Sequence, residues 1–263
     1  MKSGVKPEQK PGVKPAHRSI AIGLCCACLA ALCSSPIAAE TLSREQIVVR
    51  LASAARDFSN LEAPGADLSG LDFTGANLFG ANLKGANLTD AKLGGCNLNV
   101  AILRDALLVN ADLRQASLFS SVLANANLSG ADLRGARLMA NLEGANLEGA
   151  NLAQVKGGAD MRNQPMGLIR VVLARAKMKG VKLNEADLSR ADLSFADLRN
   201  ADLSSTDLTR ANLTGVDFSG ATLDKTTLTN AQIHNAIFTG AMHLASVRGM
   251  ETTEGRDTAV FDR

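Results

Sequence analysis

From residue 66 to residue 240 the chain repeats every five residues, with one large apolar residue at the centre of each unit. Thirty-three centres occur, and all are apolar: twenty-eight Leu, three Phe, Met178 and Ile233. The residue two before the centre is Ala in twenty-four units, and the residue just before it is Asp or Asn in nineteen. Neither an α-helix nor a β-strand keeps a five-residue apolar period in phase. The chain must therefore turn every five residues.

Each unit predicts one short extended side of a coil. The large and the small apolar residue point inward, the polar residue between them points outward, and the frequent Gly two after the centre suits a tight corner. Four sides close a square, so twenty residues make one coil, and stacked coils pair like parallel strands about 4.8 Å apart. The pattern predicts an all-β solenoid of about eight coils, about 40 Å long at that spacing.

The repeat resembles the pentapeptide-repeat family, whose motif is Ala, Asp or Asn, Leu or Phe, and two freer residues. Units such as Ala81-Asn82-Leu83-Lys84-Gly85 carry the resemblance, which covers about residues 66–240. It implies a right-handed quadrilateral β-helix. The best-known activity in the family is protection of DNA gyrase by a rod that imitates the charge of duplex DNA, and projecting loops matter in those members. Family membership alone does not fix an activity.

The ends of such a stack need covers, because they expose unpaired backbone and the Leu column. Ser43 and Gln46 form a capping-box pattern, and Ile47 and Leu51 give the inner stripe of a short N-terminal capping helix over about 43–56. After Phe238 the pattern decays. Residues 244–263 are expected to form either a C-terminal cap, using Val247, Val260 and Phe261, or a partly loose tail.

The predicted organisation has six segments. The repeat is interrupted once, by the polar and Gly-rich residues 155–165, which are expected to project as an interaction loop or a tolerated corner insertion. The segments are a signal peptide (1–39), a cap helix and lead-in (40–65), a first repeat block (66–154), the projecting loop (155–165), a second block (166–240) and a C-terminal cap or tail (241–263).

The amino terminus has the pattern of a secretory signal peptide. Five Lys or Arg and one Glu within residues 1–18 precede an uncharged apolar run from Ile20 to Leu32, which is short for a membrane span. Small residues favour cleavage between Ala39 and Glu40, which predicts a periplasmic or secreted protein without a stable membrane span. An uncleaved anchor and a misplaced start are the alternatives.

Composition argues against chemistry at a catalytic, cofactor or metal site. The chain has no Trp, no Tyr and three His, and no metal-ligand spacing, phosphate loop or nucleophile elbow occurs. Four of the five cysteines lie within residues 1–39, and Cys96 takes an inward Ala position, where its thiol should be buried and inert. We therefore expect a protein that is not an enzyme and needs no cofactor or metal.

These features predict an exported scaffold that binds another protein or an envelope component, and a homodimer is left open. The alternative is an intracellular modulator of a type II topoisomerase that mimics DNA. Without residues 1–39 the formal charge changes from +2 to −2, because five bases and one acid are lost, and residues 161–184 carry bases and no acid. A near-neutral chain with a basic stretch argues against mimicry of DNA and gives no reason to expect nucleic-acid binding.

Two candidate interaction surfaces are predicted, the first from outward apolar positions that recur at multiples of twenty residues and the second from closely spaced bases beside the 155–165 loop. The first is an apolar interface, with intramolecular cover by the 155–165 loop or the tail as the alternative. Its residues are Phe79, Val100, Ile102, Phe119, Val122 and Met139. The second is a basic patch for an anionic partner, with a merely solvated face as the alternative. Its residues are Arg170, Arg175, Lys177, Lys179 and Lys182.

Overall fold

The structure is a computed structural model that describes residues 40–53, 56–158 and 170–262. The chain divides into two units, Met1–Ala38 and Ala39–Arg263, and the described residues all belong to the second. The predicted signal peptide therefore lies outside the described residues. So do residues 159–165 of the predicted loop and the repeat centre Leu168.

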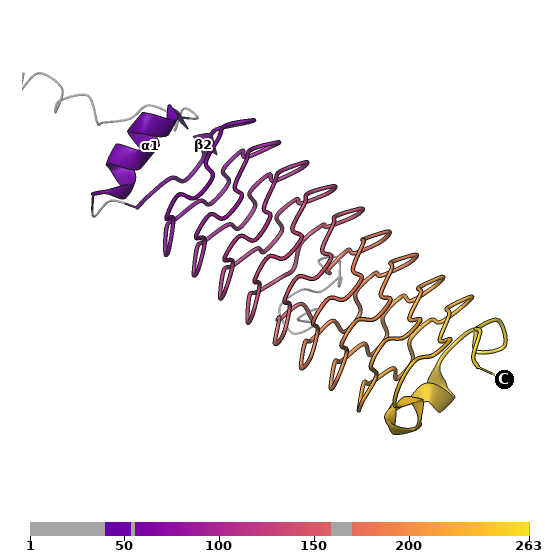
Figure 1. The fold of residues 1–263 in the computed structure, drawn as a ribbon. Coiled ribbons are helices and arrows are strands. Elements are labelled where there is room, and N and C mark those ends of the chain that lie inside the picture. The colour runs from indigo at the N-terminus through magenta and orange to yellow at the C-terminus, as the bar shows by residue number, and fades with distance from the viewer. Residues whose placement is uncertain (1–39, 54–55, 159–169, 263) are drawn as a thin grey trace, which may run out of the picture. The chain divides into compact units, whose positions relative to one another are not determined.

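The second unit is a stack of four-sided coils (Figure 1). Outward residues twenty apart pair in parallel from coil to coil, as in Asn77 with Asn97 and Ile102 with Val122. Four ladders of such pairs run along the stack. We name the four sides by the first outward residue of each ladder: side 1 at Asp57, side 2 at Glu62, side 3 at Asp67 and side 4 at Asp72.

Tight turns make the corners between sides. At the regular corners, the N–H of the residue three after the centre donates to the carbonyl of the centre, as from Ala76 to Phe73 at 2.7 Å. The second residue after the centre has a positive φ, for example 69° at Gly75, which suits a type II turn and explains why Gly recurs there.

The core is the column of repeat centres. All thirty-two described centres are at most 1% exposed, and the small inward residues pack between them. Where a polar residue replaces the inward Ala it is satisfied locally: the hydroxyls of Thr206 and Thr226 donate to the carbonyls of Leu183 and Leu203, each at 2.8 Å. The inward assignments of the described repeat centres are thus confirmed.

The N-terminal end carries helix α1 (Arg44–Leu51) and the short strands β1 (Glu40–Thr41) and β2 (Leu61–Glu62), which pair in parallel. Ser43 and Gln46 form the capping box of α1, and Ile47 is fully buried against the first coil. Ladder pairing begins at Asp57, nine residues before the predicted start of the repeat at residue 66. Phe58 and Ala63 take the centre positions of these first units, and Leu61 takes the small inward position.

The C-terminal end continues the ladders with a longer unit. The outward residues Met242, Arg248, Glu254 and Val260 pair with the coil before them at six-residue intervals. Short 3-10 helices, η2 (Leu244–Ser246) and η3 (Met250–Thr252), lie in the corners. Phe261 stacks on Phe238 with ring centroids 5.0 Å apart, and Val247 packs on the core, so these residues form a last coil and not a loose tail.

The prediction of about eight coils is too low, because the first and last coils use residues outside the motif. On side 1, ten outward residues pair one after another, and each belongs to a different coil. These outward residues are Asp57, Asn77, Asn97, Ser117, Arg137, Lys156, Asp187, Asp207, Thr227 and Arg248.

The interruption of the repeat begins later than predicted. Val155 is 1% exposed and points inward, and Lys156 pairs with both Arg137 and Asp187, so these two residues belong to the coil and do not project. The next rung, on side 2, is Val172. The eleven extra residues therefore enter at the corner between sides 1 and 2.

Candidate functional site

An apolar surface lies where sides 1 and 2 meet in the N-terminal half of the stack. Ile102 is 41% exposed on side 2, where it pairs with the half-buried Val122. Phe79 and the half-buried Phe119 lie on side 1, and Val100 occupies the corner between the sides. We call these five residues, Phe79, Val100, Ile102, Phe119 and Val122, the apolar corner. The structure thus brings together five of the six residues of the predicted interface.

Met139 does not belong to the apolar corner. Its side chain is only 3% exposed, whereas the interface prediction placed it outward. The repeat loses one residue here, since the centres Leu138 and Leu142 are four apart, and the corner at Met139 and Ala140 has no regular turn. The shorter corner removes the outward position, so both residues are buried.

The backbone of Val100 is strained. Its φ is 62°, a left-handed conformation that β-branched residues rarely adopt. The equivalent residue one coil earlier is Gly80, with φ 66°. A strained and 48% exposed Val is therefore not explained by packing within the coil.

Side 3 carries two further outward apolar residues, Leu107 and Val109, in the same coil as Ile102. Leu107 is 43% exposed, and Val109 is half-buried. The sequence signal was available, because an apolar residue stands just before the centre Leu108, where Asp or Asn is usual. They face a different side from Ile102 and lie outside the apolar corner.

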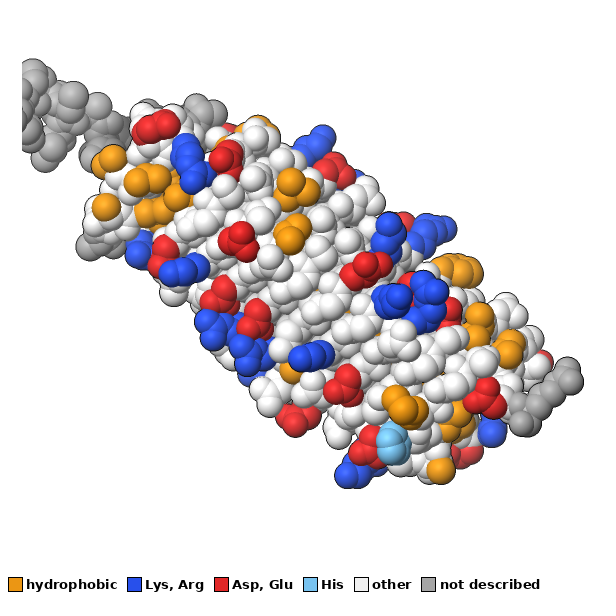
Figure 2. Space-filling view, viewed as in Figure 1, with side chains coloured by type: hydrophobic (Ala, Val, Ile, Leu, Met, Phe, Trp, Pro, Cys, Tyr) orange, Lys and Arg blue, Asp and Glu red, His pale blue; other side chains and the backbone are white. Residues whose placement is uncertain are grey.

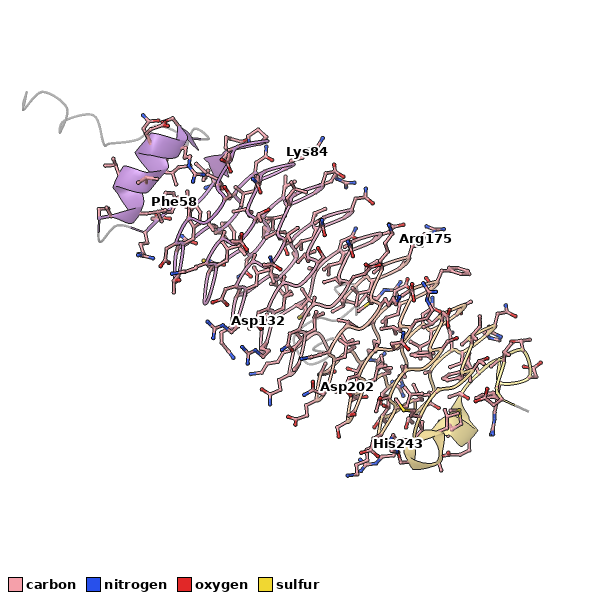
Figure 3. The ribbon with its side chains drawn as sticks, in the orientation of Figure 1. Phe58, Lys84, Asp132, Arg175, Asp202 and His243 are labelled. Atoms are coloured by element: carbon pink, nitrogen blue, oxygen red, sulfur yellow. The ribbon has the colours of Figure 1, made fainter. Side chains whose placement is uncertain are left out.

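The predicted basic residues do not form one patch. All five are exposed, but Lys177 lies on side 3 and Lys182 on side 4. Figure 3 shows Arg175 at one long edge of the stack and Asp202, the ladder partner of Lys182, at the opposite edge. Two of the five are also paired with acids: Arg170 with Asp192 at 3.3 Å, and Arg175 with Glu143 at 3.1 Å. These five bases are close in sequence, but the corners of the coil place them on different sides.

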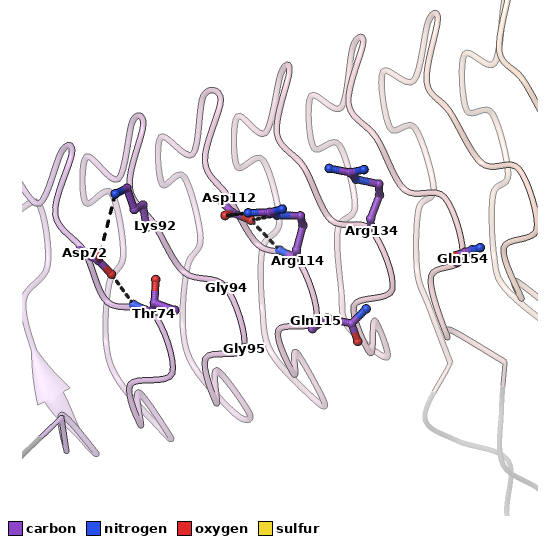
Figure 4. A pocket seen from close by; sticks show the side chains of 10 residues that line it. All are labelled: Asp72, Thr74, Lys92, Gly94, Gly95, Asp112, Arg114, Gln115, Arg134 and Gln154. Atoms are coloured by element: carbon purple, nitrogen blue, oxygen red, sulfur yellow. Dashed lines mark hydrogen bonds and ion pairs between the residues drawn. The ribbon is translucent and has the colours of Figure 1, made fainter.

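A shallow groove of about 880 Å³ runs along side 4 (Figure 4). It opens where Gly94 replaces the side chains that Thr74 and Arg114 supply in neighbouring coils. The charges at its walls are paired: Lys92 lies 3.8 Å from Asp72, and Arg114 forms a two-point ion pair with Asp112, at 2.8 and 2.6 Å. The groove is thus polar and charge-balanced.

The same Asp–Arg ion pair recurs within three Asp-Leu-Arg units. Arg134 pairs with Asp132 on side 4, and Arg199 with Asp197 on side 3, in the way that Arg114 pairs with Asp112. The hydrogen bonds that each Arg donates hold the pKa of its Asp below the usual range. Figure 2 shows acids and bases mixed over the face it presents, with apolar side chains in small separate groups.

The consecutive acids of the second block are divided among the sides. Ladder pairing puts Asp187 and Asp207 on side 1, Asp192 on side 2, Asp197 on side 3 and Asp202 on side 4. Within the described residues, no group of three or more His, Cys, Asp and Glu is placed to hold a metal ion.

Cys96 is buried as predicted. It is 1% exposed, its thiol donates to the carbonyl of Phe73 at 2.8 Å, and burial raises the pKa of the thiol to about 11. In the described part of the chain, no helix is both long enough and apolar enough to cross a bilayer.

Comparison with known proteins identifies the repeat. The family model described as pentapeptide repeats matches in eight copies, over residues 65–99, 81–118, 101–138, 168–204 and 201–240. No curated protein matches the chain.

Among solved structures, the chain is similar to HetL, a pentapeptide repeat protein involved in heterocyst differentiation regulation, from the cyanobacterium Nostoc sp. strain PCC 7120. They are 29% identical, with 83% of this chain and 94% of HetL covered and a TM-score of 0.42. The pentapeptide repeat protein Rfr23 from the cyanobacterium Cyanothece 51142 is 26% identical, over 54% of this chain and 97% of Rfr23, with a TM-score of 0.32. QnrB1, a plasmid-mediated fluoroquinolone resistance protein, is 18% identical, over 77% and 92%, with a TM-score of 0.30.

Proposed function

Because the chain belongs to the pentapeptide-repeat family, whose fold is the right-handed β-helix, we propose that it is a non-enzymatic scaffold that is exported and binds a protein or envelope component through its sides. The observation that carries this proposal is the apolar corner, since contiguous exposed apolar surface on a folded protein marks an interaction site.

Export rests on the sequence of residues 1–39. A basic start, an apolar run too short for a comfortable span and small residues before Glu40 are typical of a cleaved secretory signal. The lone buried thiol of the described residues fits any redox compartment, because it forms no disulfide and is protected from oxidation.

The alternative, an intracellular mimic of DNA that acts on a type II topoisomerase, is less well supported. Mimicry needs a one-sided negative field. Here the acids of side 4 alternate with Lys92, Arg114 and Arg134, and the second block divides its acids among all four sides.

The test is the mass and location of the protein in fractionated cells. We expect a chain that begins at Glu40 and is recovered outside the cytoplasm. A matched variant, Leu24→Arg with Leu29→Arg, disrupts the apolar run and should leave the full-length chain in the cytosol. A wild-type chain that stays in the cytosol with residues 1–39 intact would overturn export. Altered supercoiling by a purified type II topoisomerase would then support the alternative.

A further inference from the structure

We propose that side 2, with the apolar corner at its margin, is the contact between two antiparallel copies of this chain. This inference goes beyond the scaffold role and does not require export. Three observations carry it: the extent of the apolar corner, the oppositely charged Arg104 and Asp105 across side 2 from it, and the strain at Val100.

The apolar corner spans three neighbouring coils. It extends from the coil of Phe79 to the coil of Phe119 and Val122, which is two coil steps or about 10 Å along the stack at about 4.8 Å per coil. A stable dimer buries about 800 Å² per partner, in which an apolar core is surrounded by a polar rim. Side 2 supplies that rim, since Lys84, Asn82 and Asn125 surround Ile102 and Val122 on the neighbouring coils.

A charge pair at the opposite margin of side 2 selects a second copy as the partner. Arg104 and Asp105 follow Ile102 at the corner with side 3, and both are exposed. Neither makes an ion pair or a side-chain hydrogen bond with another described residue, unlike Arg114, Arg134 and Arg199. One positive and one negative group, adjacent in sequence and otherwise unpaired, complement the same two groups on a copy related by a two-fold axis.

The antiparallel orientation follows from this arrangement. A two-fold axis that lies in the contact plane and across the stack brings each margin of side 2 against the same margin of the partner. The apolar corner then meets the apolar corner, and Arg104 meets the partner's Asp105. A parallel pair would instead place apolar residues against this charged pair. The strained Val100 adds its side chain to the apolar margin, where it gains contacts that a monomer does not provide.

Sedimentation of the purified chain over a concentration series tests the dimer. We expect the wild type to dimerise, and Ile102→Asp to weaken the dimer more than about tenfold by placing a carboxylate in the apolar contact. Leu107→Asp is the matched control, because Leu107 is as exposed as Ile102 but lies on side 3. It should leave the dimer unchanged.

A charge exchange identifies the partner as a copy of the chain. Arg104→Asp and Asp105→Arg should each weaken the dimer about tenfold, and the two together should restore it. Arg is compatible with the backbone at residue 105, since Arg175, Arg190 and Arg210 hold the same corner position with φ of 57°, 62° and 59°. A monomer at every concentration, a dimer indifferent to Ile102→Asp, or no recovery in the double exchange would overturn the proposal. None of these results bears on export.

Discussion

The Asp or Asn before each repeat centre acts on the backbone of its own unit. Its side-chain oxygen accepts the N–H two residues later, for example from Ser69 to Asp67 at 3.1 Å and from Thr89 to Asn87 at 3.1 Å. An Asn can also donate to the coil before it, as Asn97 does to Asn77 at 2.9 Å. These short polar side chains therefore start the turn and also join neighbouring coils.

Leu113→Asp should destabilise the fold strongly. Leu113 is fully buried, and an unpaired carboxylate in the dry column costs several kcal/mol of unfolding free energy, on the order of 4. The outward control is Asp112→Ser, which should cost about 1 kcal/mol, since Ser117 holds the same position one side further along the coil. Chemical denaturation of the two variants measures both values. Equal losses would contradict the inward and outward assignment.

Val100→Gly should stabilise the protein by about 1 kcal/mol at concentrations where it is monomeric. Gly relieves the left-handed strain of a β-branched residue, and this relief exceeds the added entropy of the unfolded chain. The converse change, Gly85→Val, should destabilise by a similar amount: Gly85 has φ 65°, and a Cβ there would meet no atom within 4 Å. Thermal unfolding of both variants checks whether backbone conformation alone sets the sign.

At the scale of the element, a side of the coil is held by stacked Asp-Leu-Arg units. Arg114 reaches its own Asp112 and also approaches Asp132 of the next coil at 3.8 Å, and Arg199 approaches Asp217 at the same distance. Each guanidinium group thus interacts with the Asp of its own unit and with the ladder-paired Asp of the next coil.

Stability should therefore fall in acid. Arg114, Arg134 and Arg199 hold the pKa values of Asp112, Asp132 and Asp197 below their usual range in the folded state. Their contribution is complete above the unfolded pKa of about 4 and is lost as pH falls through the lower folded values. The melting temperature should drop between about pH 5 and pH 2. In a variant with all three Arg changed to Gln the drop should be smaller, and an unchanged drop would contradict this account.

Regular elements were predictable and exceptions were not. Leu, Ala and Asp positions follow from a strict period, whereas the first coil departs from the motif because Ala63 replaces a large centre. The last coil departs from it because Met242 and Arg248 are six residues apart. Met139 was misplaced by a corner one residue shorter, and the basic residues near Lys177 and Lys182 were grouped because closeness in sequence does not imply one side of a coil.

At the scale of the whole molecule, the two ends of the described unit are closed differently. Helix α1 lays Ile47 on the first coil and anchors Arg44 on the carbonyls of Asp67 and Ser69. The last coil ends in Phe261, half-buried on Phe238, with nothing equivalent to α1 beyond it in the described residues.

A chain that begins at Arg56 should be less stable than one that begins at Glu40. Removing α1 uncovers the first coil, and the loss of buried Ile47 with Leu42 and Leu51 should cost about 3 kcal/mol or more. In a stacked repeat this loss falls mainly on the coils next to the end. Hydrogen exchange should therefore speed up around Leu68 and remain unchanged around Leu198. Uniform acceleration would instead indicate that the stack opens as one unit.

The rate at which the single thiol of the described residues, Cys96, reacts with a reagent measures how often neighbouring coils separate. Cys96 is enclosed by the inward column, so a thiol reagent in native buffer reacts only after its coil separates from the one before it. Once separated, the thiol regains an ordinary pKa of about 8.5 and ordinary reactivity. The labelling rate then reports how often local unfolding that starts at α1 extends along the stack as far as the coil of Cys96. Comparing chains that begin at Glu40 and Arg56 would distinguish fraying from the end from rupture in the middle.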